Sequence, residues 1–267
     1  MFARKEMTSI WSRKCVAAML PVFAAAAFAP VAYSATLFSE NFDSYANGAA
    51  GNTIPQITTA GIGAGDSVTV STAQALSGAN SLKYTSNNVD EPVQPDIFFN
   101  FSSPVTAATI GLNLSFSYQK AGDAYDPNIW VMFGGPNAGF ANGNIALRNN
   151  GMNNFFSTTG DGFQGTGGNE FAWHTVNVAY TFTNNGTNIT GYSADFTTAG
   201  GFFTPSFSLT TTGLNISSID SLRFQFRGNA GDVYLDNVSA TSVIPEPTAM
   251  VLLGMGVVSL LRRRRMA

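Results

Sequence analysis

Apolar and polar residues alternate along much of this 267-residue chain. The stretch GLNLSFSYQK, residues 111–120, places Leu112, Leu114 and Phe116 on one side and polar residues between them. SLRFQFRG (221–228) and WHTVNVAYTF (173–182) repeat the two-residue period. Successive side chains of a β-strand point to opposite faces, so this pattern predicts half-buried strands with one face in a core and one in water.

Further segments of similar character predict about a dozen strands in all: 36–42, 66–72, 81–86, 96–103, 128–134, 144–148, 189–197, 202–209 and 232–241. Clusters of glycine, asparagine and threonine, such as SGANS, TNNGTN, TTAGG and TTGLN, predict the turns between them. No sustained helical period occurs in residues 35–243. The sequence therefore predicts an all-β domain over 35–243, a two-sheet antiparallel jelly-roll sandwich. The lack of a self-similar repeat disfavours a propeller.

Residues 1–34 have the pattern of a secretory signal peptide. The lead carries four basic side chains, Arg4, Lys5, Arg13 and Lys14, ahead of the apolar run CVAAMLPVFAAAAFA. Small residues at Ala32 and Ser34 place the expected cleavage after Ser34 and imply export through the Sec translocon. The only cysteine, Cys15, lies in this segment, so the exported chain would contain no disulfide and no thiolate site.

The last residues, 244–267, predict a short hydrophobic helix followed by a basic stop. Residues 249–261 are uncharged and would span roughly 20 Å as a helix, whereas a hydrocarbon core is about 30 Å thick. Four arginines follow at Arg262, Arg263, Arg264 and Arg265, and such a cluster stays on the cytoplasmic side of a membrane. The pattern favours a transient membrane insertion that ends in cleavage, with a lasting tail anchor as the alternative.

The same tail, IPEPTAMVLLGMGVVSLLRRRRMA, closely resembles the PEP-CTERM sorting signal of Gram-negative bacteria. The matching elements are Pro245, Glu246 and Pro247, then the apolar segment, then the arginine cluster. The resemblance covers about 25 residues. It implies processing by an exosortase, a membrane-embedded protease-transpeptidase, after export across the inner membrane. It further implies a final location at the cell surface or in the exopolysaccharide matrix.

The charge of the predicted domain is strongly negative. The stretch 36–243 has 14 acidic and 5 basic side chains, although the whole chain carries only −3. Such a surface repels nucleic acid, which makes a nucleic-acid partner unexpected. It can attract divalent cations, or it can simply keep the protein soluble.

Two short patterns in this domain resemble those of jelly-roll carbohydrate-binding and lectin-like domains. One is the combination of FSENFDSY at the start of the domain with DVYLDNVSAT at its end. The other is WHTVNVAY, which is similar to a strand of laminin G-like domains. The resemblance supports the sandwich fold. It leaves the choice of ligand open.

Three carboxylates, Glu40, Asp43 and Asp236, are the main candidates for a structural calcium site. They converge if the first and last strands are neighbours, as in jelly rolls. Tyr234, Asp236 and Val238 share a parity, so an inward Asp236 would need a cation or several hydrogen-bond donors. The alternative is a β-bulge or turn at Asp236–Asn237, with the carboxylate accepting backbone amides.

Other candidate sites have weaker patterns. The loop KAGDAYDPN places Asp123, Asp126 and Asn128 at a spacing similar to that of a calcium-binding loop with oxygen ligands, but Asp-Pro also commonly begins a turn.

His174 is the only histidine, and one histidine cannot build a His-rich metal site or a complete catalytic triad. Its place on an apolar strand face predicts a core residue.

Exposed aromatic side chains could stack on the apolar faces of sugar rings. The best candidates are Tyr125, Trp130 and Trp173. Most aromatic residues of the chain are expected in the core.

The sequence contains no recognisable catalytic motif. Glycoside hydrolysis needs two carboxylates that flank one bond, and no paired-glutamate motif, phosphate loop or nucleophile elbow is found. The prediction is therefore an exported surface or exopolysaccharide-matrix protein, not an enzyme, with a structural or adhesive role. The alternatives are a carbohydrate-binding module with a specific glycan groove and, less favoured, a secreted glycoside hydrolase.

Overall fold

The computed structural model describes residues 32–86, 95–121, 128–134, 145–149, 153–157, 163–165, 172–200, 206–227 and 231–245. Residues Ser34–Ile244 form one compact unit. Within the described ranges, the one helical element is a 3-10 turn at Gly51–Thr53, and no helix has the length and apolar character needed to cross a bilayer.

Two antiparallel sheets make up this unit. Sheet A has the order β13-β12-β11-β6-β15-β4-β3, and β1 also pairs with β15. Its strands are β1 (Ala32–Glu40), β3 (Ser67–Ser71), β4 (Ser81–Ser86), β6 (Gly111–Ala121), β11 (His174–Asn184), β12 (Ile189–Gly200), β13 (Ser206–Ile216) and β15 (Gly231–Pro245). Sheet B has the order β10-β9-β8-β7-β14-β5-β2. Its strands are β2 (Ile57–Ala60), β5 (Asp96–Thr106), β7 (Asn128–Gly134), β8 (Ile145–Asn149), β9 (Asn153–Ser157), β10 (Phe163–Gly165) and β14 (Ser218–Arg227).

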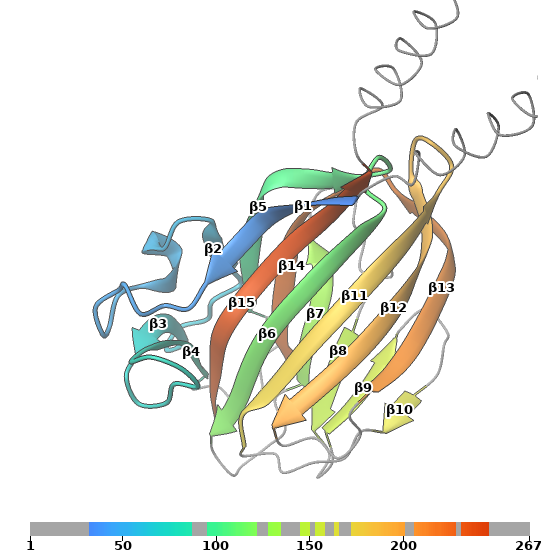
Figure 1. Cartoon of the computed structure of the whole chain (residues 1–267). Helices are drawn as coiled ribbons and strands as arrows, with labels where there is room; N and C mark the ends of the chain where they lie inside the picture. The colour runs from blue at the N-terminus through green and yellow to red at the C-terminus, as the bar shows by residue number, and fades with distance from the viewer. Residues whose placement is uncertain are drawn as a thin grey trace, which may run out of the picture. The chain divides into compact units, whose positions relative to one another are not determined.

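The two sheets face each other, with sheet A in front in Figure 1 and β7, β8 and β14 behind it. The predicted all-β, two-sheet jelly-roll sandwich is therefore confirmed. The first and last strands are neighbours, because β1 pairs with β15, so the condition for Glu40, Asp43 and Asp236 to lie near one another is met.

The core lies between the sheets and is rich in aromatic rings. Phe224 of β14 is fully buried and meets Phe116 of β6 edge-on, at a centroid distance of 5.1 Å. Phe133 of β7 contacts Tyr180 of β11 at 5.0 Å. Rings from both sheets interdigitate, and aromatic pairs of this geometry add stabilisation beyond their buried area.

The predicted alternation holds in the strands that build this core. In β11, His174, Val176, Val178, Tyr180 and Phe182 are all buried. Cross-strand pairing aligns them with the buried column of β6, since His174 faces Tyr118 and Val178 faces Leu114. The residues between them project from the outer face of sheet A.

One parity prediction is wrong, for a local reason. Val233 and Leu235 are the buried inward residues of β15 before a bulge, and Val238 and Ala240 are inward after it. The pairing of β15 with β6 shifts between Asp236 and Ser239, and Asn237 has φ 51°. The extra residue of the bulge moves the inward set by one position, so Tyr234 and Val238 lie on opposite faces.

One predicted turn is wrong, and a second begins later than predicted. The TTGLN segment lies inside β13, which continues through Gly213, a glycine with φ 76°. Most of TTAGG lies inside β12, which ends at Gly200 (φ 86°). The short strands β2, β9 and β10 were not predicted.

Candidate functional site

The outer face of sheet A carries two rows of side chains that cross four strands, and all of them except Ala179 are polar. Ser239 of β15 pairs with Ser115 of β6, which pairs with Asn177 of β11, which pairs with Thr197 of β12. The second row, one pleat along, contains Thr241, Asn113, Ala179 and Asp195. Neighbouring strands lie about 4.8 Å apart, so each row extends for roughly 14 Å. We call these eight residues the polar face.

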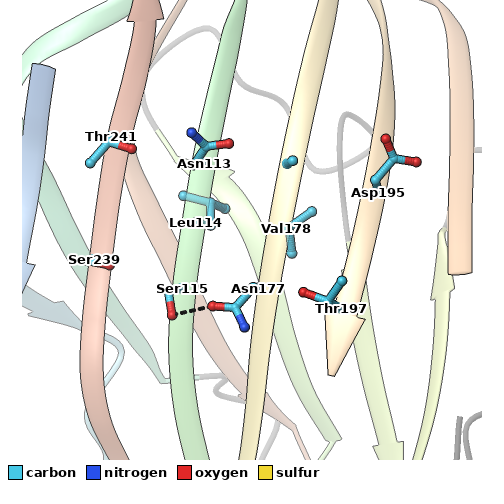
Figure 2. Close-up of a pocket in the computed structure, with 10 residues that line it drawn as sticks. Asn113, Leu114, Ser115, Asn177, Val178, Asp195, Thr197, Ser239 and Thr241 are labelled. Atoms are coloured by element: carbon cyan, nitrogen blue, oxygen red, sulfur yellow. Dashed lines mark hydrogen bonds between the residues drawn. The ribbon is translucent and has the colours of Figure 1, made fainter. Parts of the chain in front are cut away.

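A shallow hollow of about 340 Å³ lies over the polar face. Figure 2 shows Asn113, Asn177, Asp195 and Thr197 projecting into it from three adjacent strands. The Ser115 hydroxyl donates a hydrogen bond to Asn177 Oδ1 at 2.7 Å. The Ser208 hydroxyl of β13 donates to Asp195 Oδ1 at 2.6 Å. These bonds orient Asn177 and Asp195 within the hollow, whose lining also includes the apolar residues Leu114, Val178 and Ala179.

A second hollow, of about 460 Å³, continues the polar face toward β1. Ser115 and Ser239 line both hollows, and Glu40, Asn41 and Asn237 line the second. The bulge in β15 places Asn237 at this edge. Amides, hydroxyls and carboxylates thus form one continuous surface that can hydrogen-bond a hydroxylated ligand.

Asp236 lies beside this surface but is fully buried. It pairs with Ser117, whose neighbours Phe116 and Tyr118 face the core, so Asp236 belongs to the outer face. The loop between β3 and β4 covers it: Asp236 Oδ2 accepts the backbone N–H groups of Leu76 at 2.9 Å and Ser77 at 3.1 Å. Asp236 Oδ1 accepts the N–H of Asn237 at 2.7 Å. The alternative interpretation, a bulge whose carboxylate accepts backbone amides, therefore describes this residue.

The pKa of the Asp236 carboxyl lies above its usual value. Burial is the largest cause, because desolvation disfavours the charged form. The N–H groups of Ser77, Leu76 and Asn237 oppose the rise in pKa, whereas the negative charge of Asp43 adds to it.

Asp43 binds the second part of the loop between β3 and β4. Its Oδ1 accepts the N–H groups of Ala79 at 2.7 Å and Asn80 at 3.0 Å. Gly78 has φ 67°, and a Cβ placed there would overlap the Asp43 carboxylate at 1.8 Å. Only glycine allows the backbone to wrap this closely around the carboxylate. Asp43 and Asp236 together therefore fix the loop against sheet A.

Glu40 stabilises the turn that follows β1. Its Oε1 accepts the N–H groups of Asn41 at 3.0 Å and Phe42 at 2.8 Å, and its Oε2 accepts the Tyr45 hydroxyl at 3.1 Å. Within the part of the chain that the structure describes, no three His, Cys, Asp or Glu side chains converge in a metal-holding group. Calcium at Glu40, Asp43 and Asp236 stays a prediction.

The remaining predicted site residues are not brought together. His174 is fully buried and stacks on Tyr118 at 5.1 Å, as expected of a core histidine. Trp173 directly precedes β11 of sheet A and is half-buried, whereas Trp130 belongs to β7 of sheet B. Asn128 begins β7. Tyr125, Asp123 and Asp126 lie outside the described residues, so stacking on sugar and the second cation loop stay predictions.

Sequence reasoning did not single out the polar face. The available signal was the identity of the outward positions, Asn113 and Ser115 in one predicted strand and Asn177 in another. The two strands are about sixty residues apart in sequence, and only the pairing register places these side chains in one row.

The sandwich ends where the tail begins, because β15 runs to Pro245. Residues 243–265 match the family model of the PEP-CTERM protein-sorting motif. This chain carries a PEP-CTERM sorting signal. The PEP-CTERM motif implies a secreted protein with a C-terminal sorting signal and an exosortase as its processing partner. Glu246, Pro247 and the four arginines of the motif lie outside the described residues.

No curated protein matches this PEP-CTERM chain significantly. Among solved structures it is similar to a PL-14 alginate lyase from Aplysia kurodai, with TM-score 0.47, 12% identity, and coverage of 80% of this chain and 99% of the lyase. It is also similar to the catalytic domain of a glycoside hydrolase family 131 protein from Coprinopsis cinerea, with TM-score 0.46, 14% identity, and coverage of 77% and 93%.

A third similar structure is the CBM22-1 xylan-binding domain of Xyn10C from Paenibacillus barcinonensis, with TM-score 0.35, 12% identity, and coverage of 81% and 99%. At these TM-scores, the similarities transfer neither a ligand nor an activity to this chain.

Proposed function

We propose that this chain is an exported protein of the cell surface or the exopolysaccharide matrix, processed by an exosortase, with a structural or adhesive rather than enzymatic role. Its polar face is the proposed contact with extracellular polysaccharide. The observation that carries this proposal is the combination of a sorting signal with an open, hydroxyl- and amide-rich sheet face at Asn113, Ser115 and Asn177.

The openness of the polar face favours weak and repeated contacts. A shallow surface buries little of a ligand, so the affinity of each copy is low. Many copies anchored on one cell still hold a polymer strongly, because the effective concentration of the second and later sites is high. Asp195 is the one carboxylate among the eight residues of the polar face, which suits a neutral or weakly charged polymer better than a polyanion.

The second candidate is a carbohydrate-binding module with a defined glycan groove. The two adjoining hollows, of about 340 and 460 Å³, favour it because together they could seat several sugar units. The two candidates differ in specificity and affinity rather than in location.

A glycan array separates these candidates. We expect weak, broad binding for the matrix role and low-micromolar binding to one glycan for the module. Replacing Asn113 and Asn177 together with alanine should reduce retention on the polysaccharide of the producing cells about fivefold or more, since two exposed amides lose their hydrogen bonds. The matched control is Asn52→Ala, an exposed asparagine in the 3-10 turn, which should bind as the parent does. Equal binding by both variants would exclude the polar face as the contact.

Processing gives a separate test. Mass spectrometry of native protein should find a chain that starts near Ala35 and ends near Pro245. Cleavage near Pro245 would remove the apolar segment and all four terminal arginines. Surface material that retains Ala267 would contradict both the processing and the proposed destination.

A further inference from the structure

Four large apolar side chains are exposed in the described part of the chain: Tyr33 (64%), Leu76 (41%), Ile110 (39%) and Ile244 (36%). Ile110 and Ile244 lie at the same end of sheet A. The Ile110 N–H donates to the Val243 carbonyl at 2.9 Å, so the backbone of Ile110 lies beside the residue that precedes Ile244.

Both isoleucines lie just beyond the buried part of sheet A. Leu112 of β6 and Ser242 of β15 are a buried pair on these two strands. The Phe182 N–H donates to the Ile110 carbonyl at 3.0 Å and fixes the isoleucine to the end of β11 as well. Figure 1 shows the end of β15 beside the turn that joins β5 to β6. We call Ile110 and Ile244 the apolar end.

Two turns at this end, residues 107–110 and 184–188, contain only alanine, threonine, isoleucine, asparagine and glycine. Asp220 lies at the same end of sheet B, two residues after Ser218, which pairs with Thr106. Isoleucines beside uncharged turns can enter the headgroup region of a bilayer without desolvating a charge in those turns.

The length of the following chain limits how far this end can lie from a membrane. Four residues, 245–248, lie between Ile244 and Ala249, where the apolar part of the sorting signal begins. The five residue steps from Ile244 to Ala249 span at most about 18 Å when the chain is fully extended. The headgroup layer on each side takes up several ångströms of that length. While the tail is inserted, the apolar end is therefore confined near the lipid surface, where even a weak contact is favoured by its high effective concentration.

We propose that Ile110 and Ile244 rest on the lipid surface while the sorting signal is inserted, and so hold the sandwich end-on to the membrane before the tail is cut. The proposed binding partner of the apolar end is the headgroup region of the bilayer. This inference depends on the sorting signal and not on polysaccharide binding, which uses a different face, so either can fail without the other.

The test uses the exported precursor, purified from cells that lack the exosortase, in vesicles of phosphatidylethanolamine and phosphatidylglycerol. Without the signal peptide this precursor has no native cysteine. A nitrobenzoxadiazole label is attached through Ile110→Cys or, as a matched control, Leu76→Cys. Leu76 is about as exposed as Ile110. It lies far from the apolar end, because its N–H donates to Asp236. Asp236 is eight residues, or about 26 Å of strand, from Ile244 along β15.

We expect nitroxide-bearing lipids to quench the label at position 110 at least twofold more than the label at position 76. Equal quenching at the two positions would overturn the proposal. Thermal melts of both labelled proteins verify that each remains folded.

A second measurement distinguishes contact of the apolar end with lipid from contact with the exosortase. Replacing Ile110 and Ile244 with serine should slow removal of the tail in cells severalfold, whereas Leu76→Ser should leave it unchanged. Slower removal without preferential quenching at position 110 would mean that the apolar end contacts the exosortase, and would refute contact with lipid.

Discussion

Replacing Asp236 with alanine is expected to lower the free energy of unfolding by about 3 kcal/mol. The carboxylate accepts the backbone N–H groups of Leu76, Ser77 and Asn237 and is fully buried. The substitution removes all three acceptor contacts at once, and a buried donor left without its partner costs about 1–3 kcal/mol. Urea unfolding followed by circular dichroism measures the loss.

Asp195→Ala is the matched control for this experiment. Asp195 lies in the same sheet, is exposed, and accepts a hydrogen bond from the Ser208 hydroxyl. Its loss should change the free energy of unfolding by no more than about 0.5 kcal/mol. If the two variants were equally stable, the loop between β3 and β4 would not depend on Asp236.

The same unfolding measurements address calcium. An ion that binds only the folded protein raises the melting temperature, by an amount that grows with the logarithm of the ion concentration once this exceeds Kd. If calcium lies among Glu40, Asp43 and Asp236, the parent should melt at a higher temperature in millimolar calcium than in chelator, and Asp236→Ala should lose that difference. Identical melting of the parent in both solutions would leave the backbone amides as the partners of these carboxylates.

Replacing Phe224 with alanine is expected to cost about 4 kcal/mol. Phe224 is fully buried and meets Phe116 of sheet A at 5.1 Å and Phe99 of β5 at 5.3 Å, both edge-on. The substitution removes the ring that joins the two sheets and leaves a cavity that rigid strands on both sides cannot close. Chemical unfolding of the variant gives the value directly.

Phe224→Leu is the companion variant, because it keeps most of the apolar volume. It should cost about 1.5 kcal/mol or less. A loss from Phe224→Ala no larger than that from Phe224→Leu would show that the space between the sheets collapses around the missing ring, which would contradict the tight packing of Phe116 and Phe99.

The two-residue period alone was enough to predict most strands. It works best for β6 and β11, where large apolar residues alternate with mostly polar ones over most of each strand. It fails at β15, because the bulge at Asn237 changes the inward parity within one strand. It also fails at Gly213, because glycine is common both in turns and at irregular positions inside strands.

The candidate site was predictable only in part. The sequence placed Asp43 and Asp236 together only on the condition that the first and last strands are neighbours, and in the structure both carboxylates bind the loop between β3 and β4. Their partners could not be predicted, because backbone amides leave no signature in side-chain identity. The polar face escaped prediction for a related reason: Asn113 and Asn177 are ordinary outward residues until a register brings them together.

By itself, the sequence determined the fold class and the sorting signal. Both depend on local order along the chain: the alternation of apolar residues in one case, and a proline-flanked apolar segment with terminal arginines in the other. Only the tertiary structure decided which polar residues share a surface, what Asp236 binds, and that Ile110 lies at the end of β15. These features depend on strand order, register and one bulge, which arise from contacts between residues far apart in sequence.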